Sequence, residues 1–162
     1  RTRGRKVTAM DLILWRHAQA EQWTEGCNDL ERSLTQRGEK QAARMAGWLD
    51  RHLAEGARIL VSPARRTEQT ALALGRKYKL RPELGPNSTP AQLLELIQWP
   101  DSKSTVLVIG HQPTLGQTLA QLLALEAREC AIKKGAVWWL RHRSHEGQGQ
   151  TVVISVQSSE TL

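Results

Sequence analysis

Three short runs of apolar residues constrain the fold of this chain more than any other feature. They occupy residues 11–15, 58–62 and 105–109. Each run is short for a buried helix, and apolar residues at consecutive positions are typical of a strand that is covered on both faces. Helical patterns separate the runs. This alternation predicts an α/β fold, a three-layer sandwich whose mostly parallel central sheet is flanked by helices.

Helical spacing of apolar residues is clearest after Thr35, whose hydroxyl group can cap a helix. The apolar face of this helix consists of Ala42, Met45, Ala46, Leu49 and Leu53. Residues 18–33, which are polar and aperiodic, are predicted to form a loop. The other expected elements are helices over residues 66–79, 89–100 and from 113 onward, and strands over 80–84, 136–141 and 151–156. A glycine-rich polar loop at 145–150 joins the last two strands, which predicts a C-terminal hairpin.

The length of 162 residues favours one domain. We expect a flexible basic arm over residues 1–10, a single domain over 11–157 and a short tail over 158–162. No run approaches the roughly 20 apolar residues of a membrane-spanning helix, and the first residues lack the apolar stretch of a secretory signal. With only two cysteines, the chain is predicted to be a cytoplasmic protein that does not bind a membrane.

Basic side chains follow the three apolar runs. Arg16 and His17 come after the first, Arg66 after the second and His111 after the third. The carboxyl ends of parallel strands meet at one edge of a sheet, where such folds bind their ligands. The guanidinium group matches phosphate oxygens, and an imidazole can attack phosphorus. With no carboxylate expected beside them, these groups predict a positive pocket that transfers a phosphoryl group without a metal or another cofactor.

The same residues lie in motifs that resemble those of the histidine phosphatase superfamily, which has the phosphoglycerate-mutase-like fold. Residues 14–18, Leu-Trp-Arg-His-Ala, resemble its first motif, residues 62–70 its second, which begins Ser-Pro-x-x-Arg, and the Gly-His pair at 110–111 its third. Residues 32–38, Arg-x-Leu-Thr-x-x-Gly, resemble a segment of the short bacterial phosphohistidine phosphatases of the SixA type. The four motifs stand in family order across residues 12–113.

The resemblance implies a role for each residue of the pocket, and makes the domain over 11–157 catalytic. His17 matches the nucleophile that becomes phosphohistidine. Arg16 and Arg66 match the arginines that bind phosphate, and His111 matches the histidine that contacts the transferred oxygens. Arg65 lies one position early and is expected to face solvent. The neighbouring cations should lower the pKa of His17, which favours the neutral ring that attack requires.

Two further residues are candidates for contact with the substrate. The hydroxyl group of Ser62 is expected to cap the turn that follows it. Glu83 has the best position along the chain for a general acid, which an ester substrate needs for its leaving oxygen. A phosphohistidine leaves through nitrogen and can do without such an acid, so a Glu83 distant from the pocket would favour that substrate. His142 and His145 lack partners at ligand spacing and do not predict a metal site.

Phosphohistidine on a protein is therefore the leading substrate hypothesis, since a chain of this length has little room for a segment that caps the pocket. A phosphatase or mutase for a small phosphorylated metabolite is the alternative within enzymes. A mutase would need a lid that protects its intermediate from water, and the sequence offers no segment for one.

A basic nucleic-acid-binding module is the alternative from another class. The net charge of +7 and the isoelectric point near 10.0 suggest it, as do Trp138 and Trp139 beside nearby arginines. However, four positive charges lie in residues 1–6, which leaves +3 for the rest of the chain. Two neighbouring residues of a strand also point to opposite faces, so the tryptophans do not form one surface. We therefore expect no nucleic acid among the partners.

Overall fold

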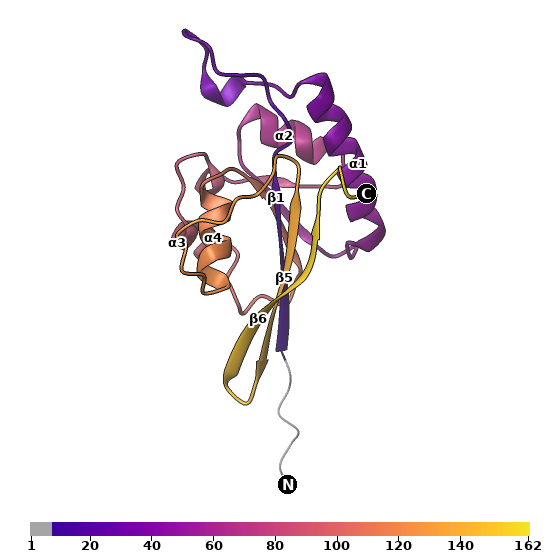
Figure 1. Cartoon of the computed structure of the whole chain (residues 1–162). Coiled ribbons are helices and arrows are strands. Elements are labelled where there is room, and N and C mark those ends of the chain that lie inside the picture. Colours follow the sequence, from indigo (N-terminus) through magenta and orange to yellow (C-terminus); the bar gives the residue numbers. More distant parts are fainter. Residues whose placement is uncertain (1–7) are drawn as a thin grey trace.

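The computed structural model describes residues 8–162 as an α/β fold around one mixed six-stranded sheet (Figure 1). The strands follow the order β3-β2-β4-β1-β5-β6 across the sheet. The first four strands of the chain pair in parallel, whereas β5 is antiparallel to β1 and β6 to β5. The strands are β1 (Thr8–Arg16), β2 (Arg58–Val61), β3 (Lys79–Leu80), β4 (Val106–Gly110), β5 (Val137–His145) and β6 (Gln148–Gln157).

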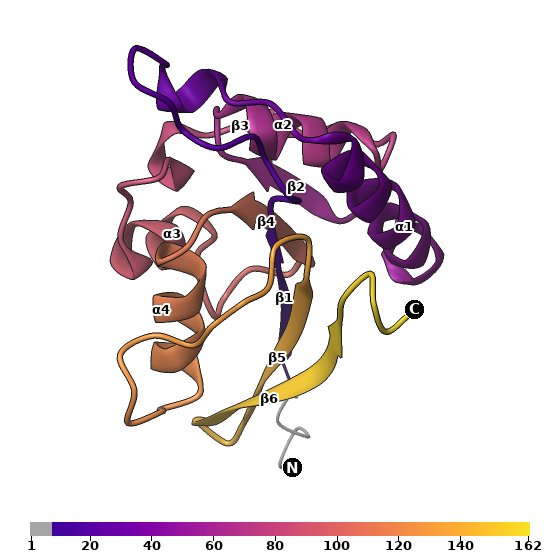
Figure 2. The ribbon, with the colours of Figure 1, turned by 45° about the horizontal axis from the view of Figure 1, so that its top comes forward.

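Helices cover both faces of this sheet, as Figure 2 shows. One face carries α1 (Gln36–His52) and α2 (Arg65–Leu72), and the other carries α3 (Pro90–Leu96) and α4 (Thr114–Leu122). Two short 3-10 helices lie in connections, η1 (Asp29–Glu31) and η2 (Pro82–Leu84). The three-layer sandwich with a mostly parallel sheet and a C-terminal hairpin is therefore confirmed.

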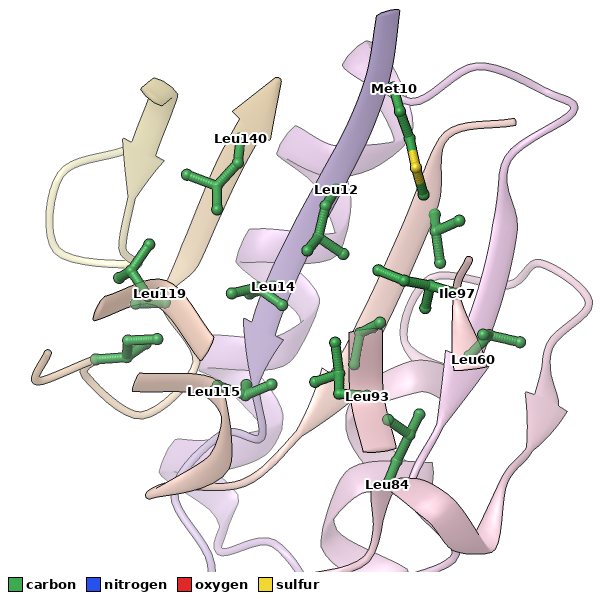
Figure 3. Packing of buried hydrophobic residues seen from close by; sticks show 14 residues of the cluster. Met10, Leu12, Leu14, Leu60, Leu84, Leu93, Ile97, Leu115, Leu119 and Leu140 are labelled. Carbon is green, nitrogen blue, oxygen red and sulfur yellow. The ribbon is translucent and has the colours of Figure 1, made fainter. Parts of the chain in front are cut away.

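Strand β1 divides the core into two layers because its side chains alternate between the faces of the sheet. Leu12 and Leu14 pack with the side chains of α3 and α4, as Figure 3 shows, whereas Ile13 and Trp15 pack with those of α1. All four are fully buried. Covering a side chain of this size contributes roughly 1.5–3 kcal/mol, so the run of consecutive apolar residues is what fixes β1 at the centre.

Several expected elements are wrong in extent, among them the helix predicted over residues 89–100, which ends at Leu96. The helix predicted over residues 66–79 ends at Leu72, and Gly75 then adopts a left-handed backbone conformation with φ of 70°, which glycine allows and a helix does not. Of the strand predicted over 80–84, only Leu80 lies in a strand, as the last residue of β3, because Pro82 begins η2. Proline has no N–H group to donate to a neighbouring strand.

The C-terminal hairpin has a tighter turn than the predicted loop at 145–150. Only Glu146 and Gly147 lie between β5 and β6, with φ of 55° and 77°. Positive φ at both central residues is typical of the two-residue turns that match the twist of paired strands. Both strands are consequently longer than the sequence pattern indicates.

The first described residues differ from the expectation. Strand β1 begins at Thr8, so residues 8–10 are not part of an arm, and residues 1–7 lie outside the described part of the chain. At the other end, Leu162 packs against the core layer of α1, and its main-chain oxygen accepts a hydrogen bond from Arg44. Within residues 8–162, no helix has the length and apolar character to cross a membrane.

Candidate active site

The carboxyl ends of β1 and β4 lie side by side, joined by a hydrogen bond of 3.1 Å from the His17 N–H group to the oxygen of Gly110. This edge holds a cavity of about 280 Å³. The ring centroids of His17 and His111 are 5.4 Å apart across it. Its lining residues are Arg16, His17, Ala20, Arg32, Arg66, Pro86, His111, Gln112 and Lys134. The structure thus brings together the four residues that the strand ends predict.

His17 has a defined tautomer. Its Nδ1 atom lies 2.7 Å from the main-chain oxygen of Ala18, and a carbonyl oxygen only accepts, so Nδ1 carries the proton and Nε2 keeps its lone pair. Burial lowers the pKa of His17 to about 4, and the charges of Arg66 and Arg16 act in the same direction. The ring is therefore neutral near pH 7, with a free nucleophilic nitrogen.

The residues around His17 hold its main chain in place. Ala18 is fully buried, and its N–H group donates to Thr70 Oγ1 at 3.1 Å. The Thr70 hydroxyl group donates in turn to the main-chain oxygen of Arg66 at 2.7 Å. Thr70 thus connects the loop after β1 to α2, a role that its place in the second motif did not reveal.

Three buried nitrogen atoms of the cavity residues have no hydrogen-bond partner. They are Nε of Arg16, Nε of Arg66 and Nδ1 of His111, and no other buried side-chain nitrogen or oxygen within residues 8–162 lacks a partner. Buried polar atoms are normally paired because their desolvation is costly. Burial lowers the pKa of both arginines, yet a guanidinium group stays protonated. The arrangement suits an anion that would accept from these nitrogens.

Ser62 has a different partner from the one expected. Its hydroxyl group forms a 2.7 Å hydrogen bond with Nε2 of His111, and the N-cap of α2 is Ala64. The prediction that Ser62 caps the following turn is therefore wrong, and this buried side chain orients His111. Burial lowers the pKa of His111 to about 3, with further contributions from Arg66 and His17, so this ring is also neutral.

Glu83 does not line the cavity. Its carboxylate is ion-paired with Arg81, and the hydrogen bond from Arg81 lowers the pKa of Glu83. The carboxyl group is ionised near pH 7 and has no proton to give. Arg65, at the start of α2, is exposed as expected.

A carboxylate that the sequence analysis did not place there lies beside the cavity and is bonded to two of its lining residues. Asp29 of η1 accepts from Arg66, both through its main-chain oxygen at 2.7 Å and through Oδ2 at 3.1 Å. It also accepts from Arg32. The expectation of a pocket without an adjacent carboxylate is therefore wrong. The spacing of Asp29 and Arg32, three residues apart, was the available signal, but only the folded loop brings the pair to Arg66.

The described residues 8–162 contain no group of three or more His, Cys, Asp or Glu side chains that could hold a metal ion. His142 forms a 3.1 Å hydrogen bond with Thr151 Oγ1 and lies edge-on to Trp99. It is thus part of the packing of the hairpin against the helical layer.

A neutral imidazole with a free Nε2, beside two arginines whose Nε atoms are buried at the strand ends of an α/β sandwich, defines a site suited to phosphoryl transfer through histidine. The chain belongs to the histidine phosphatase superfamily and is a phosphatase of the SixA type. The model of branch 1 of the superfamily matches residues 12–87. This range contains the first two motifs and ends before His111.

Comparisons with individual proteins support the assignment to this family. The phosphohistidine phosphatase SixA of Escherichia coli (strain K12) is 32% identical over 121 residues, which cover 70% of this chain and 74% of that protein. A structure of the protein histidine phosphatase SixA complexed with tungstate superposes with a TM-score of 0.76 at 26% identity, covering 93% and 97% of the two chains. A mutant phosphoserine phosphatase from Entamoeba histolytica in complex with phosphoserine shares the fold at 17% identity, with a TM-score of 0.71 over 94% and 99% of the chains.

Proposed function

We propose that this phosphatase removes the phosphoryl group from phosphohistidine in a protein, through a covalent phosphohistidine intermediate on His17. The observation that carries the proposal is the hydrogen bond from Nδ1 of His17 to the Ala18 oxygen, which leaves Nε2 as the nucleophile. The likeness to the phosphohistidine phosphatase SixA supports the substrate. We further propose that the enzyme works in the cytoplasm, and that the catalytic domain, expected over residues 11–157, also includes residues 8–10 of β1.

In the first step, Nε2 of His17 attacks phosphorus and the P–N bond of the substrate breaks. The electron pair of that bond goes to the leaving imidazole nitrogen, which takes a proton from water. Arg16, Arg66 and His111 bind the oxygens of the phosphoryl group during the transfer. In the second step, a water molecule attacks phosphorus and loses a proton, the P–Nε2 electron pair returns to His17, and orthophosphate leaves.

The position of Glu83 supports a nitrogen-linked substrate. An alcohol leaving group needs a proton donor in the transition state, whereas imidazole is a good leaving group once it is protonated. Glu83 was the candidate donor, and its carboxylate is bound to Arg81 outside the cavity. A phosphohistidine substrate does not require such a donor.

The charge of the cavity supports a reaction that needs no metal. Arg66 is buried and Arg16 is partly buried, and each keeps a buried, unpartnered Nε atom, so fixed positive charge is available where a divalent cation would otherwise be needed. We propose that the enzyme requires no cofactor.

A small phosphorylated metabolite with a second anionic group is the other candidate substrate. Arg32 and the exposed Lys134 also line the cavity. These two cations suit a carboxylate or a second phosphate at a short distance from the transferred group.

Isotope labelling tests the proposal. Incubation with a ³²P-phosphohistidine protein in EDTA should yield acid-labile, base-stable label on the enzyme, which maps to His17 and is absent from His17→Ala. The matched control His145→Ala, in an exposed position beside the hairpin turn, should be labelled like the wild type. The turnover of a panel of phosphorylated metabolites, compared with that of the phosphohistidine protein, shows which of the two substrate classes the enzyme prefers. If wild type and His17→Ala are equally inactive on every phosphate compound, the proposal is wrong.

A further inference from the structure

Asp29 is the carboxylate that contacts two cationic residues of the cavity, Arg66 and Arg32. A negative charge at this place opposes the binding of a phosphoryl group. Its presence beside an anion site therefore needs a physical reason.

The contacts of Arg66 supply that reason. Both terminal nitrogens of its guanidinium group donate to Asp29, Nη1 to the main-chain oxygen at 2.7 Å and Nη2 to Oδ2 at 3.1 Å. The end of the fork is thus occupied, while Nε on its side is buried and unpartnered. Two bonds to one residue fix the plane of the group. The side that remains for an oxyanion is the one that carries Nε.

The same carboxylate fixes Arg32. Nε of Arg32 donates to Oδ1 of Asp29 at 2.9 Å, and its Nη1 donates to the main-chain oxygen of Glu21 at 2.7 Å. Asp29 therefore connects the loop after β1 to α2. Asn28 holds this turn in place, since its side chain caps η1 by accepting from the N–H group of Leu30 at 3.1 Å.

The burial of the two partners is unequal. The side chain of Arg66 is 3% exposed, whereas that of Asp29 is 42% exposed. Burial acts to raise the pKa of Asp29, but the hydrogen bond from Arg32 and the charge of Arg66 outweigh it and lower the pKa. The carboxylate is therefore ionised near pH 7. Water screens an ion pair whose carboxylate is partly exposed, so a directional role accounts for Asp29 better than a stabilising one.

We propose that Asp29 is a positioning residue that holds the guanidinium group of Arg66 so that its Nε side faces the phosphoryl group. This role rests on the phosphatase function proposed for the same cavity. It predicts a change in anion affinity that is opposite to the change expected from charge alone. If Asp29 acted only through its charge, its removal would tighten anion binding. If it positions Arg66, removal of its carboxylate oxygens weakens anion binding although the cavity becomes more positive.

Calorimetric titration with the oxyanion tungstate separates the two cases. Asp29→Ala should bind tungstate about tenfold more weakly, because the guanidinium group of Arg66 is then no longer held with its Nε side toward the anion. Asp29→Asn keeps an acceptor oxygen and should stay within about threefold of the wild type. Glu31→Gln, in the same 3-10 helix, is the control and should not change. Equal or tighter binding by Asp29→Ala would overturn the proposal.

A double-mutant cycle tests whether Asp29 acts through Arg66. In an Arg66→Lys background, which has no fork to orient, Asp29→Ala should change tungstate affinity less than twofold. An undiminished effect would contradict positioning. The melting temperature of each variant shows whether it is folded, and Asp29→Asn still tests the role of the acceptor if the alanine variant is unfolded. A wild type that binds no tungstate and is not labelled at His17 would instead refute the phosphatase function itself.

Discussion

The Nδ1 atom of His17 donates to the main-chain oxygen of Ala18, its neighbour in the chain, at 2.7 Å. The contact joins two groups of the same loop, so the protein itself directs Nε2 toward the cavity. The chain achieves this by turning sharply after β1, where the N–H group of Gly135 donates to the main-chain oxygens of Arg16 and His17. Preorganisation of this kind reduces the rearrangement required in the transition state.

The first prediction concerns the titration of His17. Burial and the neighbouring arginines lower its pKa from 6.5 to about 4, so the ring should remain neutral, and reactive, well below the pH at which an ordinary histidine becomes protonated. NMR titration of the ring should give a midpoint near 4. The variant His17→Gln identifies the signal, and a midpoint near 6.5 would contradict the buried, cationic environment.

The second prediction concerns stability against pH. The folded-state pKa values of His17 and His111 are about 4 and about 3, below their value of 6.5 in an unfolded chain. Between these values the unfolded chain binds protons that the folded protein does not, so the free energy of unfolding should fall as the pH decreases through 6.5. Each of the two histidines should lower the free energy of unfolding by on the order of 2 kcal/mol when the pH reaches about 5.

Urea denaturation at a series of pH values measures this loss. His111→Gln removes one of the two groups, so the free energy of unfolding should depend less on pH than in the wild type. If the two proteins show the same dependence on pH between about 7 and 5, His111 is not buried as a neutral ring.

The third prediction concerns Ser62, whose hydroxyl group bonds Nε2 of His111 at 2.7 Å. Ser62→Ala leaves this nitrogen without its partner in a buried site, which should cost about 1–3 kcal/mol of stability and loosen the ring. We expect phosphatase activity to fall about tenfold while His17 is still labelled. Ser155→Ala on β6, whose hydroxyl group accepts from Gln157, is the control. Unchanged activity in Ser62→Ala would show that His111 needs no support.

The sequence predicts the centre of this molecule better than its periphery. Strands β1 and β4 follow from consecutive apolar residues, which are stable only when both faces are covered. The meeting of His17 with His111 follows from the parallel pairing of those strands. The position of Asp29 does not follow, because it depends on how a polar loop folds over α2. The end of α2 was missed because a single residue, Gly75, determines it through its backbone conformation.

The last prediction explains the glycine of the motif at residues 32–38. A Cβ atom on Gly38 would lie 1.9 Å from the main-chain oxygen of Gln19, so α1 approaches the loop after His17 more closely than any side chain allows. Gly38→Ala should therefore displace this loop, reduce both stability and activity, and lower the melting temperature. Gly47, in the same helix, has no atom within 4 Å of such a Cβ. Gly47→Ala should instead stabilise the protein by up to about 1 kcal/mol, since alanine favours a helix, and should leave activity unchanged. Thermal denaturation and phosphatase assays of both variants test this difference. If the two alanine variants have equal effects on melting temperature and activity, the close approach of Gly38 to Gln19 does not hold the active-site loop.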